Sequence, residues 1–269
     1  MKKIFGLSYV LILLFSAQIQ AAPKSEYWAF WDHSDEQSHK QINHSDWNDI
    51  LKRYLVTNDP SGINRFRYGE VSNADSKKLD RYIKKLSKTD PRQYNRREQK
   101  AYWLNLYNAL TVQLVVKHYP IDSITEIGGL LSRGPWDKTL VKVEGKELSL
   151  NDIEHRILRP IWKDHKIHFG LNCASVSCPN LQPVAFSGAN VRSLLKSAGK
   201  EYINHPRGVH LKKGEMKVSS LFNWYSKDFA KDKKAMMKMF AHYADDRLAL
   251  YLLGFNGKIK YDYDWSLND

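Results

Sequence analysis

The clearest hydrophobic pattern of the chain lies between Arg96 and His118, where apolar residues cover most of the circumference of a helix. The segment is rich in good helix formers and ends just before Tyr119-Pro120, where a proline stops a helix. A helix that is apolar nearly all round belongs in a protein interior. We therefore expect this segment to be a long, buried helix at the centre of the fold.

Shorter amphipathic patterns predict further helices on both sides of the central one. They cover residues 76–86, 149–159, 189–204, 221–229, 234–243 and 247–253. The region 26–66 is aromatic and polar, and its irregular pattern predicts a helical segment that wraps around the core.

Alternating apolar and polar positions, bounded by turn residues, predict a few strands. They form hairpins at 139–148 and 209–218, a short strand at 166–172 and a closing strand at 258–265. No internal repeat or linker divides the chain. The sequence therefore predicts one α+β domain over residues 22–269, with the central helix packed on a small, mostly antiparallel sheet.

The N-terminus has the layout of a cleavable secretory signal peptide. Lys2 and Lys3 precede an uncharged apolar run of about a dozen residues, which is too short for the roughly 20 that a membrane-spanning helix needs. Small residues follow, and we expect cleavage after Ala21. Residues 1–21 are thus the predicted signal, and the remaining chain is predicted to be periplasmic or secreted, without a transmembrane segment.

Charge narrows the range of partners. The chain carries a formal net charge of +13, with lysines and arginines spread along its length. Such a surplus favours anionic neighbours. The sequence has no recognisable nucleic-acid-binding motif, and an exported protein rarely meets nucleic acid, so we expect no nucleic-acid partner. An anionic cell-envelope polymer or a peptide substrate remains as a candidate.

The two cysteines, Cys173 and Cys178, lie close together in the segment that runs from His168 to Pro179. In an oxidising compartment, two neighbouring cysteines most simply form a disulfide. The segment could instead carry a nucleophilic thiol. A metal site is less expected, because H-x₂-H-x₄-C-x₄-C, counted from His165, matches no common zinc pattern. We expect no metal and no cofactor.

Several blocks of sequence resemble the domain-of-unknown-function 547 family. They are the helix motif AYWLNLYNAL from Ala101, Tyr119-Pro120, SLNDIE from Ser149, HFGLNCAS from His168, SCP from Ser177 and YDW from Tyr263. The resemblance is strongest over residues 96–198. It implies no function. The order of a central helix followed by a strand that bears His is also similar to papain-like and transglutaminase-like cysteine enzymes, in which the central helix begins with the nucleophilic cysteine. Here that helix has no cysteine.

A thiol enzyme would therefore use Cys173 as its nucleophile, with His168 as the base that removes the thiol proton. Asn105 or Asn108, the polar residues of the central helix, could orient the base. The alternative for both asparagines is that they hydrogen-bond neighbouring backbone, as buried amides must.

Two functions remain open from the sequence. The first is a Cys-based hydrolase or transferase that acts on peptide, amide or acyl bonds. The second is a non-catalytic cell-envelope binding or assembly module, in which a Cys173–Cys178 disulfide is structural.

Overall fold

The computed structural model describes residues 22–128, 134–212 and 214–269. The predicted signal peptide, residues 1–21, lies outside the described residues. The α-helices are α1 (Ser45–Tyr54), α2 (Asn73–Ser87), α3 (Arg96–His118), α4 (Arg159–Trp162), α5 (Val191–Asn204), α6 (Leu221–Trp224), α7 (Ser226–Phe229), α8 (Lys233–Tyr243) and α9 (Asp246–Gly254). The strands are β1 (Leu55–Val56), β2 (Arg65–Phe66), β3 (Val141–Val143), β4 (Lys146–Leu148), β5 (Val209–Lys212), β6 (Glu215–Ser219) and β7 (Ile259–Asp262). Short 3-10 helices are η1 (Ala29–Trp31), η2 (Tyr68–Glu70), η3 (Pro91–Gln93), η4 (Ile124–Glu126) and η6 (His165–Phe169), and η5 (Asp152–Leu158) is a π-helix.

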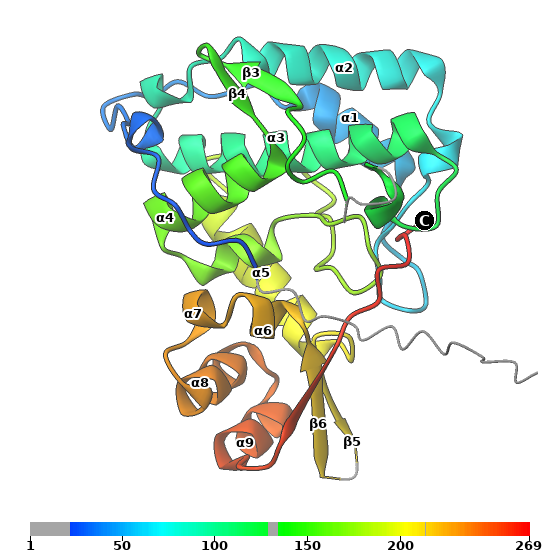
Figure 1. Cartoon of the computed structure of the whole chain (residues 1–269), viewed down its shortest axis with the longest axis vertical. Coiled ribbons are helices and arrows are strands. Elements are labelled where there is room, and N and C mark those ends of the chain that lie inside the picture. Colours follow the sequence, from blue (N-terminus) through cyan, green and yellow to red (C-terminus); the bar gives the residue numbers. More distant parts are fainter. Residues whose placement is uncertain (1–21, 129–133, 213) are drawn as a thin grey trace, which may run out of the picture.

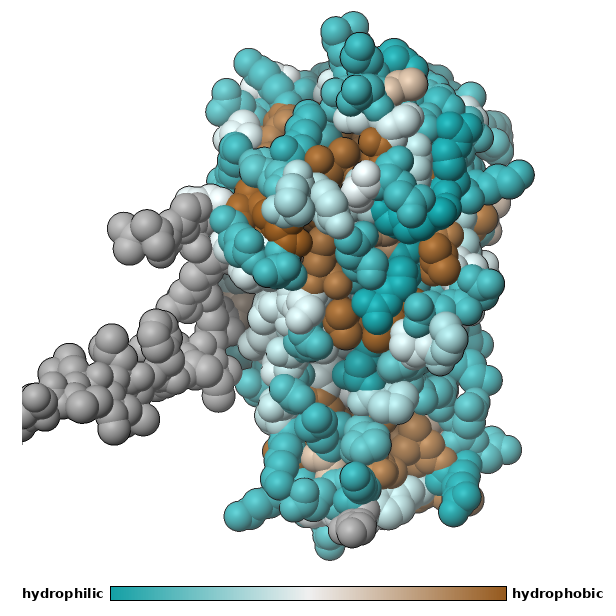
Figure 2. Space-filling view, turned by 90° about the vertical axis from the view of Figure 1, so that its right-hand side faces the viewer, coloured by the Kyte–Doolittle hydropathy of each residue, from teal (hydrophilic) through white to brown (hydrophobic). Residues whose placement is uncertain are grey.

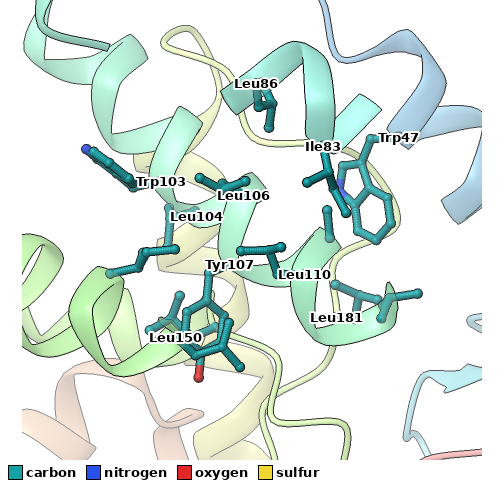
Figure 3. Packing of buried hydrophobic residues seen from close by; sticks show 14 of the residues in the cluster. Trp47, Ile83, Leu86, Trp103, Leu104, Leu106, Tyr107, Leu110, Leu150 and Leu181 are labelled. Atoms are coloured by element: carbon teal, nitrogen blue, oxygen red, sulfur yellow. The ribbon is translucent and has the colours of Figure 1, made fainter. Parts of the chain in front are cut away.

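Helix α3 is the centre of the larger part of the molecule, as its pattern predicted. It begins after Asn95, whose side chain accepts a hydrogen bond from the backbone N–H of Glu98. Helix α2 runs along one side of α3, and α1 lies behind the pair (Figure 1). Side chains such as Trp103, Leu106 and Leu110 project from α3 into the surrounding core (Figure 3). A helix covered on all sides in this way needs no polar face.

The buried apolar residues form two clusters. The larger cluster surrounds α3, and the smaller one lies among α5, β5, β6, α8 and α9 at the lower end of the molecule (Figure 1). Helix α5 connects them, because Val191 and Leu195 belong to the larger cluster while Tyr202 and Ile203 belong to the smaller one. The C-terminal segment returns from β7 to the larger cluster, where the backbone N–H of Leu267 donates to the carbonyl of Asp122.

The sheets are small. Strands β1–β2 and β3–β4 are antiparallel pairs, and β5–β6–β7 is a three-stranded sheet in which β7 runs parallel to β6. Both predicted hairpins are present, so the α+β class with mostly antiparallel sheets is confirmed. In the described part of the chain, no helix is long and apolar enough to cross a membrane.

Three sequence predictions differ from the structure. Residues 166–172 are not a strand, because the 3-10 helix η6 covers His165–Phe169 and starts at Asp164, whose side chain accepts from the backbone N–H of Lys166. The predicted helix 149–159 is mostly the π-helix η5, and the helix 221–229 is divided at Tyr225 into α6 and α7. All three of these segments contribute side chains to the junction of the two clusters.

We expect Gly199→Ala in α5 to destabilise the protein. Alanine normally stabilises a helix by about 1 kcal/mol relative to glycine. However, a Cβ at this position would lie 2.8 Å from atoms of both the Phe169 and Tyr243 rings. Overpacking of this kind costs about 1–3 kcal/mol, so the free energy of unfolding should fall.

The matched control is Gly254→Ala at the end of α9, where a Cβ would meet nothing within 4 Å. Urea denaturation should show unchanged or slightly higher stability for the control. Equal stabilisation of both variants would show that α5 does not pack against Phe169 and Tyr243 as described.

Candidate functional site

A pocket of about 780 Å³ lies where the two apolar clusters meet. Tyr107 of α3 and Leu171 line it from the side of the larger cluster, and Leu221 and Tyr225 line it from the side of the smaller one. Glu154, His155, His168 and Cys173 also line it. A concave, largely apolar pocket with a few converging polar groups is the usual form of a ligand or active site.

His168 is buried at this pocket, and both of its ring nitrogens face carboxylates. Nε2 lies 2.8 Å from Oδ2 of Asp228, and Nδ1 lies 3.5 Å from Oε1 of Glu154. The imidazole is stacked on the ring of Tyr225, with 4.1 Å between the ring centroids. A histidine placed between two carboxylates donates to them from both nitrogens when it is protonated. This arrangement favours the imidazolium form.

Arg159 completes the charged group from the last turn of the η5–α4 segment. Its Nε and Nη2 donate to the two oxygens of Asp228, at 2.6 and 3.1 Å. Its Nη1 lies 3.1 Å from Nδ1 of His155. Because a guanidinium only donates, the Nδ1 of His155 is an acceptor and that ring is neutral. Two negative and two positive side chains thus balance at the junction of the clusters.

The pKa values of the group follow from this pairing. Burial alone would lower the pKa of His168, but the hydrogen bonds and negative charges of Asp228 and Glu154 raise it above its ordinary value. Burial alone would raise the pKa of Glu154, but the positive charge that His155 gains at low pH, together with the hydrogen bond and charge of His168, lowers it to about 2. The pKa of Asp228 is lowered too, since His168 and Arg159 outweigh its burial. These shifts favour the charged form of all three groups.

Both cysteines are free thiols in the structure, and no disulfide joins them. Cys173 is half-buried, and its backbone N–H donates to Sγ of the buried Cys178 at 2.9 Å. The neighbouring Cys178 and burial raise the pKa of the Cys173 thiol well above its ordinary value. A thiol in this environment is protonated at neutral pH and a poor nucleophile.

Asn105 and Asn108 make backbone hydrogen bonds. Asn105 accepts from the N–H of Phe186 at 3.0 Å and donates to its carbonyl at 2.8 Å. Asn108 accepts from the N–H of Asn172 at 2.8 Å and donates to the carbonyl of Gly170 at 2.9 Å. The two amides thus attach the loops that follow η6 to α3. In the part of the chain that the structure describes, no hydrogen bond joins either of them to His168.

No sequence pattern predicted a role for Glu154, Asp228, Arg159 or Tyr225. Only Glu154 lies within a recognised motif, the SLNDIE block. Asp228 is 60 residues from His168 and 69 from Arg159, in a segment whose pattern indicated only an amphipathic helix. No local signal connects such distant residues.

Four of the residues that line the pocket form a contacting aromatic group. Trp136, Trp224, Tyr263 and Trp265 form it, with ring centroids of contacting pairs 4.6–5.7 Å apart. Among residues 22–128, 134–212 and 214–269, no three His, Cys, Asp or Glu side chains converge in a way that could hold a metal ion. The pocket thus offers aromatic surface, charged hydrogen-bonding groups and one thiol.

The charged group should give the protein a distinctive dependence on pH. A histidine whose folded-state pKa is raised contributes stability below its unfolded pKa of about 6.5 and loses it as the pH rises through the folded value. The difference in free energy of unfolding between the wild-type protein and His168→Gln should therefore be largest below pH 6.5 and shrink at higher pH. Urea denaturation between pH 5 and 9 measures it.

His165→Gln is the control with the opposite sign. Burial lowers the pKa of His165 to about 4, so its neutral form is the one that folding favours. The contribution of His165 should be constant above pH 6.5 and fall as the pH drops towards 4. A His168→Gln difference that does not change with pH would contradict the paired imidazolium.

Comparison with known proteins gives one match. Residues 91–203 match the family model described as "Protein of unknown function, DUF547". No curated protein and no solved structure matches the chain. The matched region contains α3, the Asn105 and Asn108 contacts, Glu154, His168 and Cys173, whereas Asp228 and Tyr225 lie beyond it. As its sequence motifs predicted, the chain carries a domain of the DUF547 family.

Proposed function

We propose that the protein is an exported binding module that holds a segment of an anionic cell-envelope polymer in the pocket between its two apolar clusters, without covalent chemistry at Cys173. One observation carries this proposal. Both ring nitrogens of His168 are directed at carboxylates, so neither is left to accept the proton of the thiol. Because these charged residues pair with one another, they would form a rigid surface for recognising a ligand.

The lining of the pocket favours a ligand with ring faces and hydroxyl groups, such as a saccharide unit. Trp224 and Trp265 supply apolar aromatic surface, which packs against the faces of rings. The ionised Glu154 at the inner end can accept hydrogen bonds from hydroxyl groups. At the pocket itself the exposed Lys138 and Asp137 balance each other. The preference for a polymer with negative groups comes from the net charge of the whole protein, which is +13 and becomes 13 − 2 = +11 once the predicted cleavage removes Lys2 and Lys3.

Export is part of the proposal and rests on residues 1–21. Their positive start, short apolar run and small residues at the cleavage position are those of a secretory signal peptide. A domain released in this way reaches the cell envelope, where anionic polymers are its neighbours.

A Cys-based hydrolase or transferase is the second candidate. It is favoured by one observation, which is that Cys173 and His168 line the same pocket. Sγ would form a bond to the carbonyl carbon of the substrate while its proton passes to a base and then to the leaving amine or alcohol. His168 is protonated, and the unprotonated Nδ1 of His155 accepts from Arg159, so Glu154 would be that base, and its low pKa makes it a weak one.

We expect binding of a soluble anionic envelope saccharide to change the tryptophan fluorescence, because three tryptophans line the pocket. Trp224→Ala should weaken the affinity at least about tenfold, as expected for loss of a large aromatic contact. Trp162→Ala is the control, because Trp162 is also half-buried but lies outside the pocket. Equal affinity of both variants, or no saccharide binding by the wild-type protein, would contradict the proposal.

Thiol reactivity separates the two candidates. We expect iodoacetamide to alkylate Cys173 very slowly at pH 7, with a rate that still rises above pH 9, because its pKa is raised. Cys173→Ser and Cys178→Ser identify the modified residue by intact mass. Rapid alkylation of Cys173 at pH 7 would favour the enzyme over the binding module. A Cys173–Cys178 disulfide in protein isolated from the envelope would retire the thiol mechanism and make the bridge structural.

A further inference from the structure

The last turn of α9 exposes a group of large apolar side chains. Leu250, Tyr251 and Leu253 are 74%, 42% and 60% exposed, while Leu252 between them is buried against α8. Leu250 and Leu253 are three residues apart and therefore lie on one face of the helix. Single exposed leucines are common on protein surfaces, but a patch of neighbouring apolar side chains is typical of an interaction surface.

Basic side chains surround this patch. Nζ of Lys233, at the start of α8, donates to the carbonyl of Asn256 at 3.0 Å and lies 5.4 Å from the centroid of the Phe255 ring. The Phe255 ring in turn contacts Tyr251, with 6.0 Å between the ring centroids. The start of α8 is thus beside the end of α9. Lys231 and Lys234 are close to Lys233 in the chain and exposed, and with the exposed Asp232 that caps α8 this segment has a net positive charge.

Further basic residues lie on α9 and directly after it. Arg247 is exposed and lies one turn before Leu250 and Tyr251, and the exposed Lys258 follows the helix. The acidic residues Asp245 and Asp246 lie at the other end of α9, where Asp245 pairs with Lys200 at 3.2 Å. The exposed apolar end of α9 is therefore next to positive charge, with the helix's own carboxylates at its far end.

We propose that the end of α9 docks the protein on the surface of an anionic phospholipid bilayer. Leucine and tyrosine side chains of a surface helix enter the boundary between headgroups and acyl chains, while lysines and arginines beside them meet the anionic headgroups. A polyanion would explain the basic residues but offers no apolar layer for Leu250 and Leu253. The combination of the two features selects the bilayer.

The docking surface is separate from the pocket. It lies at the lower left of the molecule in Figure 1, where α8 and α9 are found. Figure 2 views the molecule from the right-hand side of Figure 1, where the surface is mostly hydrophilic with apolar atoms among the hydrophilic ones. No residue of α9 lines the pocket. Docking through α9 would hold the protein at the membrane and leave the pocket open to a ligand.

Sedimentation with vesicles tests this inference. The full mature chain should bind vesicles that contain phosphatidylglycerol and phosphatidylcholine in preference to vesicles of phosphatidylcholine alone, and rising salt should weaken the binding. The double variant Leu250→Gln/Leu253→Gln should lower the vesicle affinity at least about tenfold, because two leucines no longer enter the bilayer. Lys231→Gln/Lys234→Gln should lower it about tenfold or more, since each lysine near the surface adds to the attraction.

The control is Val184→Gln, which replaces another exposed apolar residue, 46% exposed, outside α9. It should bind vesicles as the wild-type protein does, and so should Trp224→Ala, so failure of the pocket proposal is distinguishable from failure of this one. Thermal unfolding checks that each variant is folded. No preference for anionic vesicles, or equal binding of the leucine variant, would overturn the inference. A dimer that the leucine variant dissociates, without vesicle binding, would show that a second copy covers the patch.

Discussion

The junction between the two apolar clusters depends on the placement of His168 between Glu154 and Asp228. A buried charge is costly unless it is paired, and the loss of one partner leaves the others uncompensated. Here the partners come from three elements, because Glu154 is in η5, His168 in η6 and Asp228 in α7. The pairing therefore fixes the position of the smaller apolar cluster relative to the larger one. The pocket exists only where those elements are held together.

Helix α3 provides the other fixed reference. Its two asparagines bind the backbone on either side of the cysteine segment, Asn105 at Phe186 and Asn108 at Gly170 and Asn172. A side-chain amide that bonds to both a backbone N–H and a backbone carbonyl of a loop holds that loop in a defined position, although the loop has no regular secondary structure. Cys173 reaches the pocket wall because Asn172 is held in this way. The two polar residues of this largely apolar helix thus hold in place the loop that lines the site.

The sequence was sufficient for the parts of the fold that depend on local pattern. Helix α3 occupies the residues that its periodicity predicted, and both predicted hairpins are present. The prediction of a strand after Asp164 was wrong. The alternation of apolar residues there resembles a strand, but the segment is a 3-10 helix whose side chains are buried against α5 and α7. Tertiary contacts determine the conformation of this segment, and a local sequence pattern carries no information about them.

The candidate site was accessible to sequence reasoning only in part. Cys173 and His168 stood out because they are close together in a distinctive motif, and both line the pocket. The partners that set the charge of His168 come from distant segments, and acidic residues at such positions are common on any helix. The sequence therefore indicated which residues to consider. It could not indicate that the imidazole is held by carboxylates on both sides, which changes its chemistry from base to fixed cation.

The most direct test of this account is the protonation state of His168, read from the ¹⁵N chemical shifts of its two ring nitrogens. We expect both nitrogens to have the shifts of a protonated imidazolium at a pH one unit above the ordinary pKa of histidine, because Glu154 and Asp228 both accept from the ring. A neutral ring at that pH, with one nitrogen unprotonated and open to the pocket, would contradict the account and return His168 to the role of a base for Cys173.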